Sequence, residues 1–242
     1  WNDGGQGASL AAGYLAKLWE AERFAEIDPE NFVDFQSTRP HVSLEEGLTR
    51  RVDWPATVFY HARPAGLDHD VVLLLGIEPN LRWRTFTELV VGFLEELGVE
   101  LVVTLGALLA DVPHSRPVPI TGLSSDEGLV ERVGLSPSSY EGPTGIVGVL
   151  QTACAEAGMP AASLWAAVPH YVAVAPNPKG ALAILRRLES LVGVTVDASD
   201  LESAAVDYER QVTRAVELDP EVQAFVERLE RAADAEEAPT DL

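Results

Sequence analysis

Two apolar runs separated by an amphipathic segment constrain this chain most strongly. The runs span residues 71–75 (VVLLL) and 101–105 (LVVTL). Between them, apolar residues recur at the spacing of one helix face, namely Phe86, Leu89, Val90, Phe93, Leu94 and Leu97, and Gly98 ends the pattern. Runs without polar alternation are typical of strands buried on both faces. The stretch therefore predicts a strand, a right-handed crossover helix and a second, parallel strand in one sheet, which is the unit of an α/β domain.

Ligands of open parallel sheets gather at the carboxyl ends of the strands, so the residues there are the first site candidates. Glu78 follows the first run, and Arg82 comes close behind it. A carboxylate beside a guanidinium group can bind a polar ligand, or it can cap the next helix. Asn2 and Asp3 lie in the glycine-rich loop at residues 1–7. A loop that opens a helix usually follows a strand, so we expect a strand before Trp1 and these two residues at the same edge.

A second glycine-rich turn spans residues 142–148 (GPTGIVG) and opens a predicted helix. Backbone N–H groups at such a helix start can hold an anion, so Gly142, Thr144 and Gly145 are candidate ligand-binding residues. The turn lacks the lysine of a P-loop and the glycine spacing of a dinucleotide fingerprint. The alternative is a tight turn in which glycine is needed sterically.

His114 lies in a loop with an acid and a hydroxyl nearby (residues 111–116, DVPHSR). Members of a catalytic triad normally converge from distant segments, and the sequence has no nucleophile elbow. A hydrogen bond that stabilises the loop is the expected role. The acid–His–acid run at residues 68–70 lacks a second histidine at ligand spacing, so we predict no metal site. We also predict no cofactor and assign no catalytic residue.

The charge balance excludes several classes of partner. The chain has 17 basic and 38 acidic residues and a net charge of -21, which repels nucleic acid and anionic membranes. Such acidity either serves solubility or forms an acidic docking surface.

No apolar run is long enough for a bilayer and no secretory segment is visible, so we expect a cytoplasmic protein. The single cysteine, Cys154, excludes an intramolecular disulfide, and its apolar neighbours favour core packing over a reactive thiol.

The other elements follow from the same patterns. Strands are predicted at residues 23–27, 118–122 and 162–167, and helices at residues 127–133, 145–157 and 178–191. An irregular segment at residues 28–47 precedes a predicted hairpin of residues 48–53 and 57–61. Two amphipathic helices follow residue 200 and suggest a helical hairpin that covers a sheet, seals a subunit contact or acts as a docking arm. The predicted division is an α/β domain at 1–195, a helical appendage at 196–234 and an acidic tail at 235–242.

Several short motifs together resemble the proteasome-assembly-chaperone family, in an actinobacterial branch that also carries an ATP-grasp-like label. They are residues 1–5 (WNDGG), 34–36 (DFQ) with 39–40 (RP), 76–79 (GIEP) with Trp83, 110–114 (ADVPH), 140–145 (YEGPTG), 169–171 (PHY) and 176–178 (PNP). Tyr140 in the fifth motif joins the ligand-binding candidates. The chain lacks the paired lysines and acidic metal ligands that an ATP-grasp site needs.

The resemblance implies a phosphorylase/hydrolase-like fold, which is a three-layer α/β/α sandwich with a mixed, largely parallel sheet. It also implies a homo-oligomer, for which we expect a trimer, and proteasome subunits or another protein as partners. Relatives dock through a C-terminal tail with a penultimate tyrosine. Residues 239–242 read PTDL, so we do not expect that docking mode here.

Three hypotheses on function remain after these observations. The first is a non-enzymatic, oligomeric protein that acts by binding other proteins, with the helices after residue 200 at or beside the contact surface. The second is a small-molecule hydrolase or phosphorylase that acts on a nucleoside-like or amide substrate. In that case Asn2, Asp3, Glu78 and the turn at residues 142–145 would line the site. The third is a scaffold with a vestigial pocket.

Overall fold

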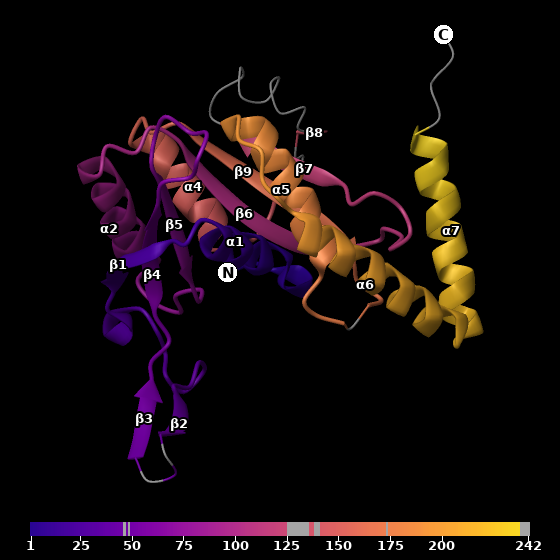
Figure 1. The fold of residues 1–242 in the computed structure, drawn as a ribbon, viewed down its shortest axis with the longest axis horizontal. Coiled ribbons are helices and arrows are strands. Elements are labelled where there is room, and N and C mark those ends of the chain that lie inside the picture. The colour runs from indigo at the N-terminus through magenta and orange to yellow at the C-terminus, as the bar shows by residue number, and fades with distance from the viewer. Residues whose placement is uncertain (46, 48, 125–135, 138–140, 173, 238–242) are drawn as a thin grey trace. The chain divides into compact units, whose positions relative to one another are not determined.

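The chain forms a mixed α/β fold in the computed structural model, which describes residues 1–242 except 46, 48, 125–135, 138–140, 173 and 238–242 (Figure 1). Two compact units are built from interleaved segments. The first contains Trp1 and residues 12–102 and 141–161, and the second contains residues 2–11, 103–140 and 162–242. The three-layer arrangement and the boundary expected near residue 195 stay predictions.

The first unit contains an antiparallel sheet with the strand order β1-β4-β5. Its strands are β1 (Glu22–Ile27), β4 (Thr57–Ala62) and β5 (Val71–Gly76). A separate antiparallel ribbon, which extends away from this sheet in Figure 1, consists of β2 (His41–Glu45) and β3 (Thr49–Asp53). The helical elements are η2 (Pro29–Asn31), α2 (Trp83–Glu96), α4 (Ile146–Glu156) and the larger part of α1 (Gly7–Leu18).

The second unit contains a sheet with the strand order β6-β9-β7-β8. Its strands are β6 (Val102–Ala110), β7 (Ile120–Ser124), β8 (Ser136–Pro137) and β9 (Ala161–Pro169). Strand β7 pairs antiparallel with β9 and parallel with β8. The helical elements are η1 (Gly4–Gln6), the start of α1, α5 (Pro178–Val192), α6 (Ser199–Glu217) and α7 (Pro220–Glu237).

The prediction that the two apolar strands pair with each other in parallel is wrong. Both runs are strands, and the segment between them is helix α2, as predicted. However, β5 pairs antiparallel with β4 in one sheet, and β6 belongs to the sheet that contains β9. Four of the pairings described above (β1–β4, β4–β5, β2–β3 and β7–β9) are antiparallel and one (β7–β8) is parallel, so the expected predominance of parallel pairs is not found among these five. The burial expected on both faces of the first run is only partial, because each of residues 71–75 is partly exposed, and an apolar run does not specify which strand lies beside it.

The predicted hairpin of residues 48–53 and 57–61 is also wrong. Strand β3 pairs with β2, in the segment expected to be irregular, and β4 pairs with β1 and β5. The turn at residues 54–55 therefore connects two sheets instead of closing a hairpin. The other predicted strands and helices are found within a few residues of the expected bounds. The helix predicted at residues 127–133 lies outside the described residues.

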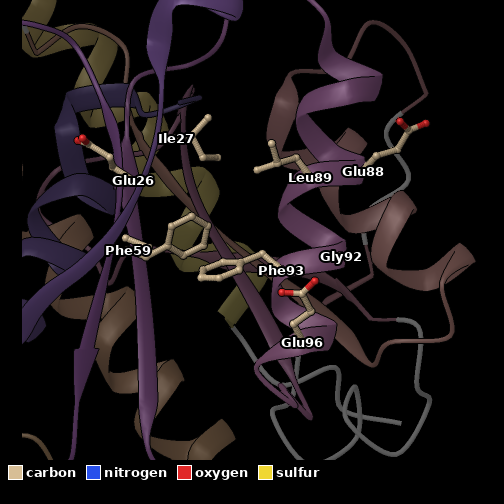
Figure 2. Close-up of a pocket in the computed structure, with 9 residues that line it drawn as sticks. Glu26, Ile27, Phe59, Glu88, Leu89, Gly92, Phe93 and Glu96 are labelled. Carbon is tan, nitrogen blue, oxygen red and sulfur yellow. The ribbon is translucent and has the colours of Figure 1, made fainter.

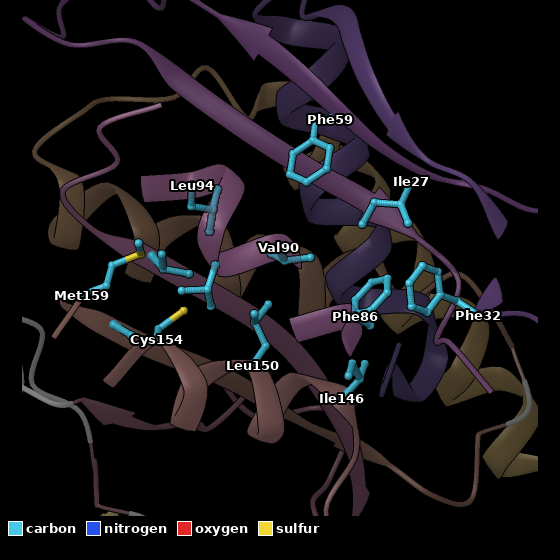
Figure 3. Packing of buried hydrophobic residues seen from close by; sticks show 13 residues of the cluster. Ile27, Phe32, Phe59, Phe86, Val90, Leu94, Ile146, Leu150, Cys154 and Met159 are labelled. Atoms are coloured by element: carbon cyan, nitrogen blue, oxygen red, sulfur yellow. The ribbon is translucent and has the colours of Figure 1, made fainter. Parts of the chain in front are cut away.

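The core of the first unit is formed largely by two helix stripes (Figure 3). On α2, Phe86, Val90 and Leu94 are four residues apart, and on α4 Ile146, Leu150 and Cys154 repeat the same spacing. Residues four apart lie on one face of a helix, so each helix buries a continuous apolar face. Cys154 is fully buried, as predicted, and burial raises the pKa of its thiol.

A smaller buried cluster connects α6 and α7 in the second unit. Its members are Tyr208, Val212 and Val216 of α6 and Val226 of α7, with Tyr171, Val172 and Val222 packed against them. The three residues of α6 are again four apart, which is the amphipathic pattern that predicted this helix. Helix α7 begins at Pro220, because proline is accepted in the first turn, where its missing N–H has no partner to lose.

Candidate functional site

The first unit brings Glu78 and the glycine-rich turn together. Glu78 comes directly after β5, and its Oε1 accepts a hydrogen bond of 2.9 Å from the backbone N–H of Ile146, the first residue of α4. Gly145 is the N-cap residue of this helix and has no side chain with which to cap it. The Glu78 carboxylate therefore occupies the place that an anion would take at this helix start.

The side chain of Thr144 fills the space next to Gly148, in the first turn of α4. A Cβ atom on Gly148 would lie 2.2 Å from Thr144 Oγ1, so only glycine fits there without a shift of the threonine side chain. Thr144 Oγ1 also donates to the carbonyl of Gly145 at 3.4 Å. Gly142 is exposed in the same turn, and Tyr140 lies outside the described residues. The close packing of Thr144 and Gly148 agrees with the steric interpretation of this motif.

Arg82 has a local structural partner. It is the N-cap residue of α2 and has a left-handed backbone with φ of 55°. Its Nη1 donates to Asn31 Oδ1 at 3.0 Å, across to η2. The peptide N–H of Asn80 also reaches this segment, because it donates to the carbonyl of Phe32 at 2.8 Å. Arg82 thus ties the start of α2 to the loop before β2, while Glu78 is bound to α4.

In the second unit, Asp3 caps a helix in the same way. Its Oδ1 and Oδ2 accept hydrogen bonds from the backbone N–H groups of Ala8 and Ser9 at 2.7 and 2.8 Å, in the first turn of α1. The carbonyl of Asn2 accepts from Ala107 N–H at 3.1 Å, and Asp3 forms a parallel bridge with Ala107 of β6. Asn2 and Asp3 belong to the second unit and Glu78 to the first, so a ligand site shared by all three stays a prediction.

The glycines of the N-terminal loop permit close contact with the start of α5. Gly5 has φ of +61°, and its carbonyl accepts from Asn177 N–H at 2.7 Å. A Cβ on Gly5 would meet Asn177 Cβ at 3.2 Å. Asn177 is 2% exposed, and its Oδ1 accepts from Gly180 N–H at 2.9 Å as the N-cap of α5. The asparagine therefore connects the loop and the helix, and its place before Pro178 at a helix start is typical of such a cap.

His114 is the most connected of the predicted site residues. It is 4% exposed, its Nδ1 lies 2.9 Å from Tyr171 Oη, and its Nε2 lies 3.1 Å from Thr213 Oγ1. The Tyr171 oxygen also accepts from the His114 backbone N–H at 2.8 Å, so the tyrosine hydroxyl hydrogen is left to donate to Nδ1. Nε2–H then donates to Thr213, whose hydroxyl donates to the carbonyl of Glu209 at 2.9 Å. Every donor has an acceptor when the imidazole is neutral.

The electrostatic surroundings of His114 favour that neutral form. Burial, and then the Lys179 ammonium, lower the pKa of His114, against the raising effect of Glu209 and Glu230. Burial also raises the pKa of Tyr171 to about 12, so its phenol stays protonated at neutral pH. An imidazole held between two hydroxyl groups in this way connects its loop to Tyr171 and to α6. The geometry agrees with the predicted loop-stabilising hydrogen bond at His114.

The loop that carries His114 binds both C-terminal helices. Lys179 donates to the carbonyl of His114 and to the carboxylate of Glu209 on α6. Ser115 donates to Glu230 on α7, and Arg116 makes two hydrogen bonds of 2.6 and 2.9 Å to Asp234 on the same helix. The sequence predicted neither Thr213 nor Asp234 as a partner, because they lie 99 and 118 residues away along the chain.

The described residues lack a metal-binding cluster and a membrane-spanning helix. No group of three or more His, Cys, Asp or Glu side chains there is arranged to hold a metal ion. Among the same residues, no helix has the length and apolar character needed to cross a membrane.

Known proteins resemble the chain over most of its length. A family model described as the PAC2 family matches residues 1–216. The crystal structure of a PAC2 family protein from Streptomyces avermitilis is 48% identical, with 93% of this chain and 95% of that chain covered and a TM-score of 0.86. A Mycobacterium tuberculosis proteasome-assembly chaperone homologue is 47% identical, with 93% and 96% covered and a TM-score of 0.86.

A more distant structure shares the fold alone. PbaB, an archaeal proteasome activator from Pyrococcus furiosus, is 20% identical, with 88% of this chain and 89% of that chain covered and a TM-score of 0.69. No protein with a curated functional description matches the chain.

Proposed function

Because the chain belongs to the PAC2 family, we propose that it acts by binding other proteins in proteasome assembly, with proteasome subunits as its partners. The observation that carries this proposal is the 47% identity, over 93% of the chain, to a proteasome-assembly chaperone homologue. We place this activity in the cytoplasm and expect a homo-oligomer, with a trimer as the first state to test.

The C-terminal helices are the surface that we assign to this binding. Helix α6 leaves Val206 59% exposed, and Leu218 at its end is 86% exposed. Apolar side chains at these exposures offer contact area to a partner. Hydrogen bonds from Lys179 to Glu209, from Ser115 to Glu230 and from Arg116 to Asp234 hold α6 and α7 in place without covering those side chains.

The geometry supports binding over the hydrolase or phosphorylase alternative. The carboxylates of Asp3 and Glu78, which that alternative would use, each accept backbone hydrogen bonds at the start of a helix. His114 is saturated by Tyr171 and Thr213. The two carboxylates and the imidazole would have to break these hydrogen bonds before they could bind or react with a substrate.

Affinity capture tests the proposal. The full chain, immobilised through a tag, is incubated with an extract of a proteasome-bearing actinobacterium, and the proteins retained are identified by mass spectrometry. We expect the parent chain to retain proteasome subunits and a Val206→Asp, Leu218→Asp double variant to retain fewer of them. The control is a double variant with aspartate at Leu108 and Leu109, which are exposed on β6, and it should retain as many as the parent chain. Retention of other proteins without any proteasome subunit would contradict the proposal.

A further inference from the structure

The ribbon of β2 and β3 carries an exposed apolar face that has no role in the proposed binding through α6 and α7. Val42 lies opposite Val52 in the register of the two strands, and Leu44 lies opposite Arg50. Side chains two residues apart on a strand share a face, so these four lie on one face of the ribbon. The three apolar side chains among them are between 43% and 65% exposed. In the described part of the chain no third strand pairs with the ribbon, which extends away from the β1-β4-β5 sheet in Figure 1.

The opposite face of the ribbon is polar, and its side chains bind one another. Asp53 accepts a hydrogen bond of 3.3 Å from the Ser43 hydroxyl group, and its carboxylate also lies 2.8 Å from Arg51 Nε. This face is therefore suited to water, whereas the apolar face gains stability only when it leaves water. A two-stranded ribbon is at best marginally stable in water unless its apolar face packs on another surface. We therefore expect this face to be covered when the protein is assembled.

A groove with a volume of about 430 Å³ lies at the base of the ribbon. Its apolar lining includes Val52 and the rings of Phe35 and Trp54, which meet edge to face with centroids 4.9 Å apart. Trp54 directly follows β3 and is 54% exposed, so the aromatic surface is open to a partner. The groove therefore offers aromatic contact area at the end of the ribbon that is attached to the first unit.

Carboxylates from β1 and from the segment around η2 line the same groove. Glu26 is paired with Arg23, and its carboxyl group points away from Phe93 of α2 in Figure 2. Asp28 accepts a hydrogen bond of 3.0 Å from the backbone N–H of Glu30, because it is the N-cap residue of η2. The Glu30 carboxylate itself has no cationic partner among the described residues. The groove thus combines aromatic rings with a carboxylate that is free to pair with an incoming cation.

The far end of the ribbon carries the chemistry that fits such a groove. Leu44 and Arg50 form the last but one cross-strand pair, and side chains in such a pair lie about 5 Å apart. Arg50 is exposed and has no ion-pair partner in the part of the chain that the structure describes. An apolar side chain and a free cation therefore stand next to each other on the apolar face.

The distribution of charge favours a second copy of this chain as the occupant. Residues 39–54 contain three arginines and three acidic residues, so this segment is balanced, and the net charge of -21 belongs to the rest of the chain. Two copies therefore repel each other least where their ribbons and groove bases meet. The ribbon end and the groove are also complementary in charge and in apolar character, and every copy carries both.

We propose that the ribbon of one copy docks into the groove of a second copy. Leu44 of the first copy lies on the rings of Phe35 and Trp54 of the second, and Arg50 pairs with Glu30. Because the two contacting surfaces lie at opposite ends of the ribbon, the contact is heterologous and can close into a ring, such as the expected trimer. This inference rests on the homo-oligomer of the proposed function and identifies its interface, but it does not depend on proteasome binding.

A charge exchange tests the ion pair between copies. Sedimentation velocity of the full chain at about 1 to 100 μM measures self-association, which we expect for the parent chain in this range. Arg50→Glu and Glu30→Arg each bring like charges together and should weaken self-association about tenfold or more. The double variant that combines them restores an opposite pair and should associate within about threefold of the parent chain. Arg84→Glu, at an exposed position on α2, is the control with the same change of charge and should leave self-association unchanged.

A second pair of variants tests the apolar part of the contact. Leu44→Asp places a charge on the aromatic rings of the groove and should weaken self-association about tenfold or more. Leu97→Asp, which changes another exposed leucine at the end of α2, is the control and should have no such effect. Urea unfolding of each variant at a concentration where the parent chain is monomeric verifies that the fold is retained.

Three results would overturn the proposal, and they differ in what else they affect. A parent chain that stays monomeric over the whole range would overturn both this interface and the expected homo-oligomer, and it would leave the ribbon to a different protein. An oligomer that persists in Arg50→Glu and Leu44→Asp would overturn the interface alone. Single variants that dissociate without rescue in the double variant would exclude the groove as the docking site. None of these results depends on whether the chain binds proteasome subunits.

Discussion

At the scale of single residues, Glu78 is the clearest case in which a predicted ligand-binding residue has a structural partner. Its carboxylate accepts from Ile146 N–H at the start of α4, so replacement by alanine should remove a helix cap. We expect Glu78→Ala to lower the free energy of unfolding by about 1 kcal/mol. Urea unfolding measures this, and Glu88→Ala, at an exposed position on α2, is the control with an expected change below about 0.5 kcal/mol. A Glu78→Ala variant more stable than the parent chain would instead indicate a carboxylate kept for a ligand.

His114 gives a pH dependence with a definite sign. Burial and Lys179 lower its pKa in the folded protein, whereas the unfolded chain takes up the proton at the ordinary value of about 6.5. The folded state therefore binds fewer protons, and stability that is present above about pH 6.5 is lost as the pH falls through the folded pKa. We expect unfolding free energies measured from pH 7.5 to 5 to decline more steeply in the parent chain than in His114→Gln. Parallel curves for the two proteins would contradict this assignment.

The contacts of these residues show what can be predicted from neighbouring residues in the sequence and what cannot. Capping was already one of the two interpretations of Glu78, and core packing was predicted for Cys154, because both follow from a few neighbouring residues. A stabilising hydrogen bond at His114 was expected too, but its partners Tyr171, which donates to the ring, and Thr213, which accepts from it, were not named. Contacts between residues 57 and 99 positions apart depend on how the elements pack, which no local pattern contains.

At the scale of elements, burial patterns predicted strands and helices better than they predicted pairing. Residues 71–75 are a strand, as expected, but its neighbour β4 runs antiparallel to it. Strand β3 likewise exists where it was predicted and pairs with β2, a segment that was expected to be irregular. Alternation and apolar content describe the two faces of a strand. Its edges, where pairing occurs, present the same backbone groups in every sequence.

Helix α7 offers a test at this scale. Arg116 holds it through two hydrogen bonds to Asp234, and this ion pair also lowers the pKa of the Asp234 carboxyl. Because both side chains are partly exposed, we expect Arg116→Ala to weaken the attachment of α7 only modestly. Hydrogen exchange of α7 amides should then become about twofold to fivefold faster. Arg231→Ala, on an exposed part of α7 itself, is the control, and equal exchange rates in both variants would refute the role of Arg116.

At the scale of the whole molecule, the sequence predicted a mixed α/β fold and the family, and the comparisons confirm both. The family followed from several short motifs that occur together, and their structural roles now explain some of them. Asp3 caps α1, Gly5 contacts Asn177, and His114 connects to α6. These motifs maintain packing and helix starts.

The central claim is that this chain binds proteasome subunits, and sedimentation velocity of purified components tests it most directly. The full chain is mixed in equimolar amounts with purified, unassembled proteasome subunits at about 10 μM, which detects a dissociation constant in the micromolar range. We predict a new boundary that contains both proteins and that the Val206→Asp, Leu218→Asp variant diminishes. Two independent boundaries at the positions of the separate components would contradict the account.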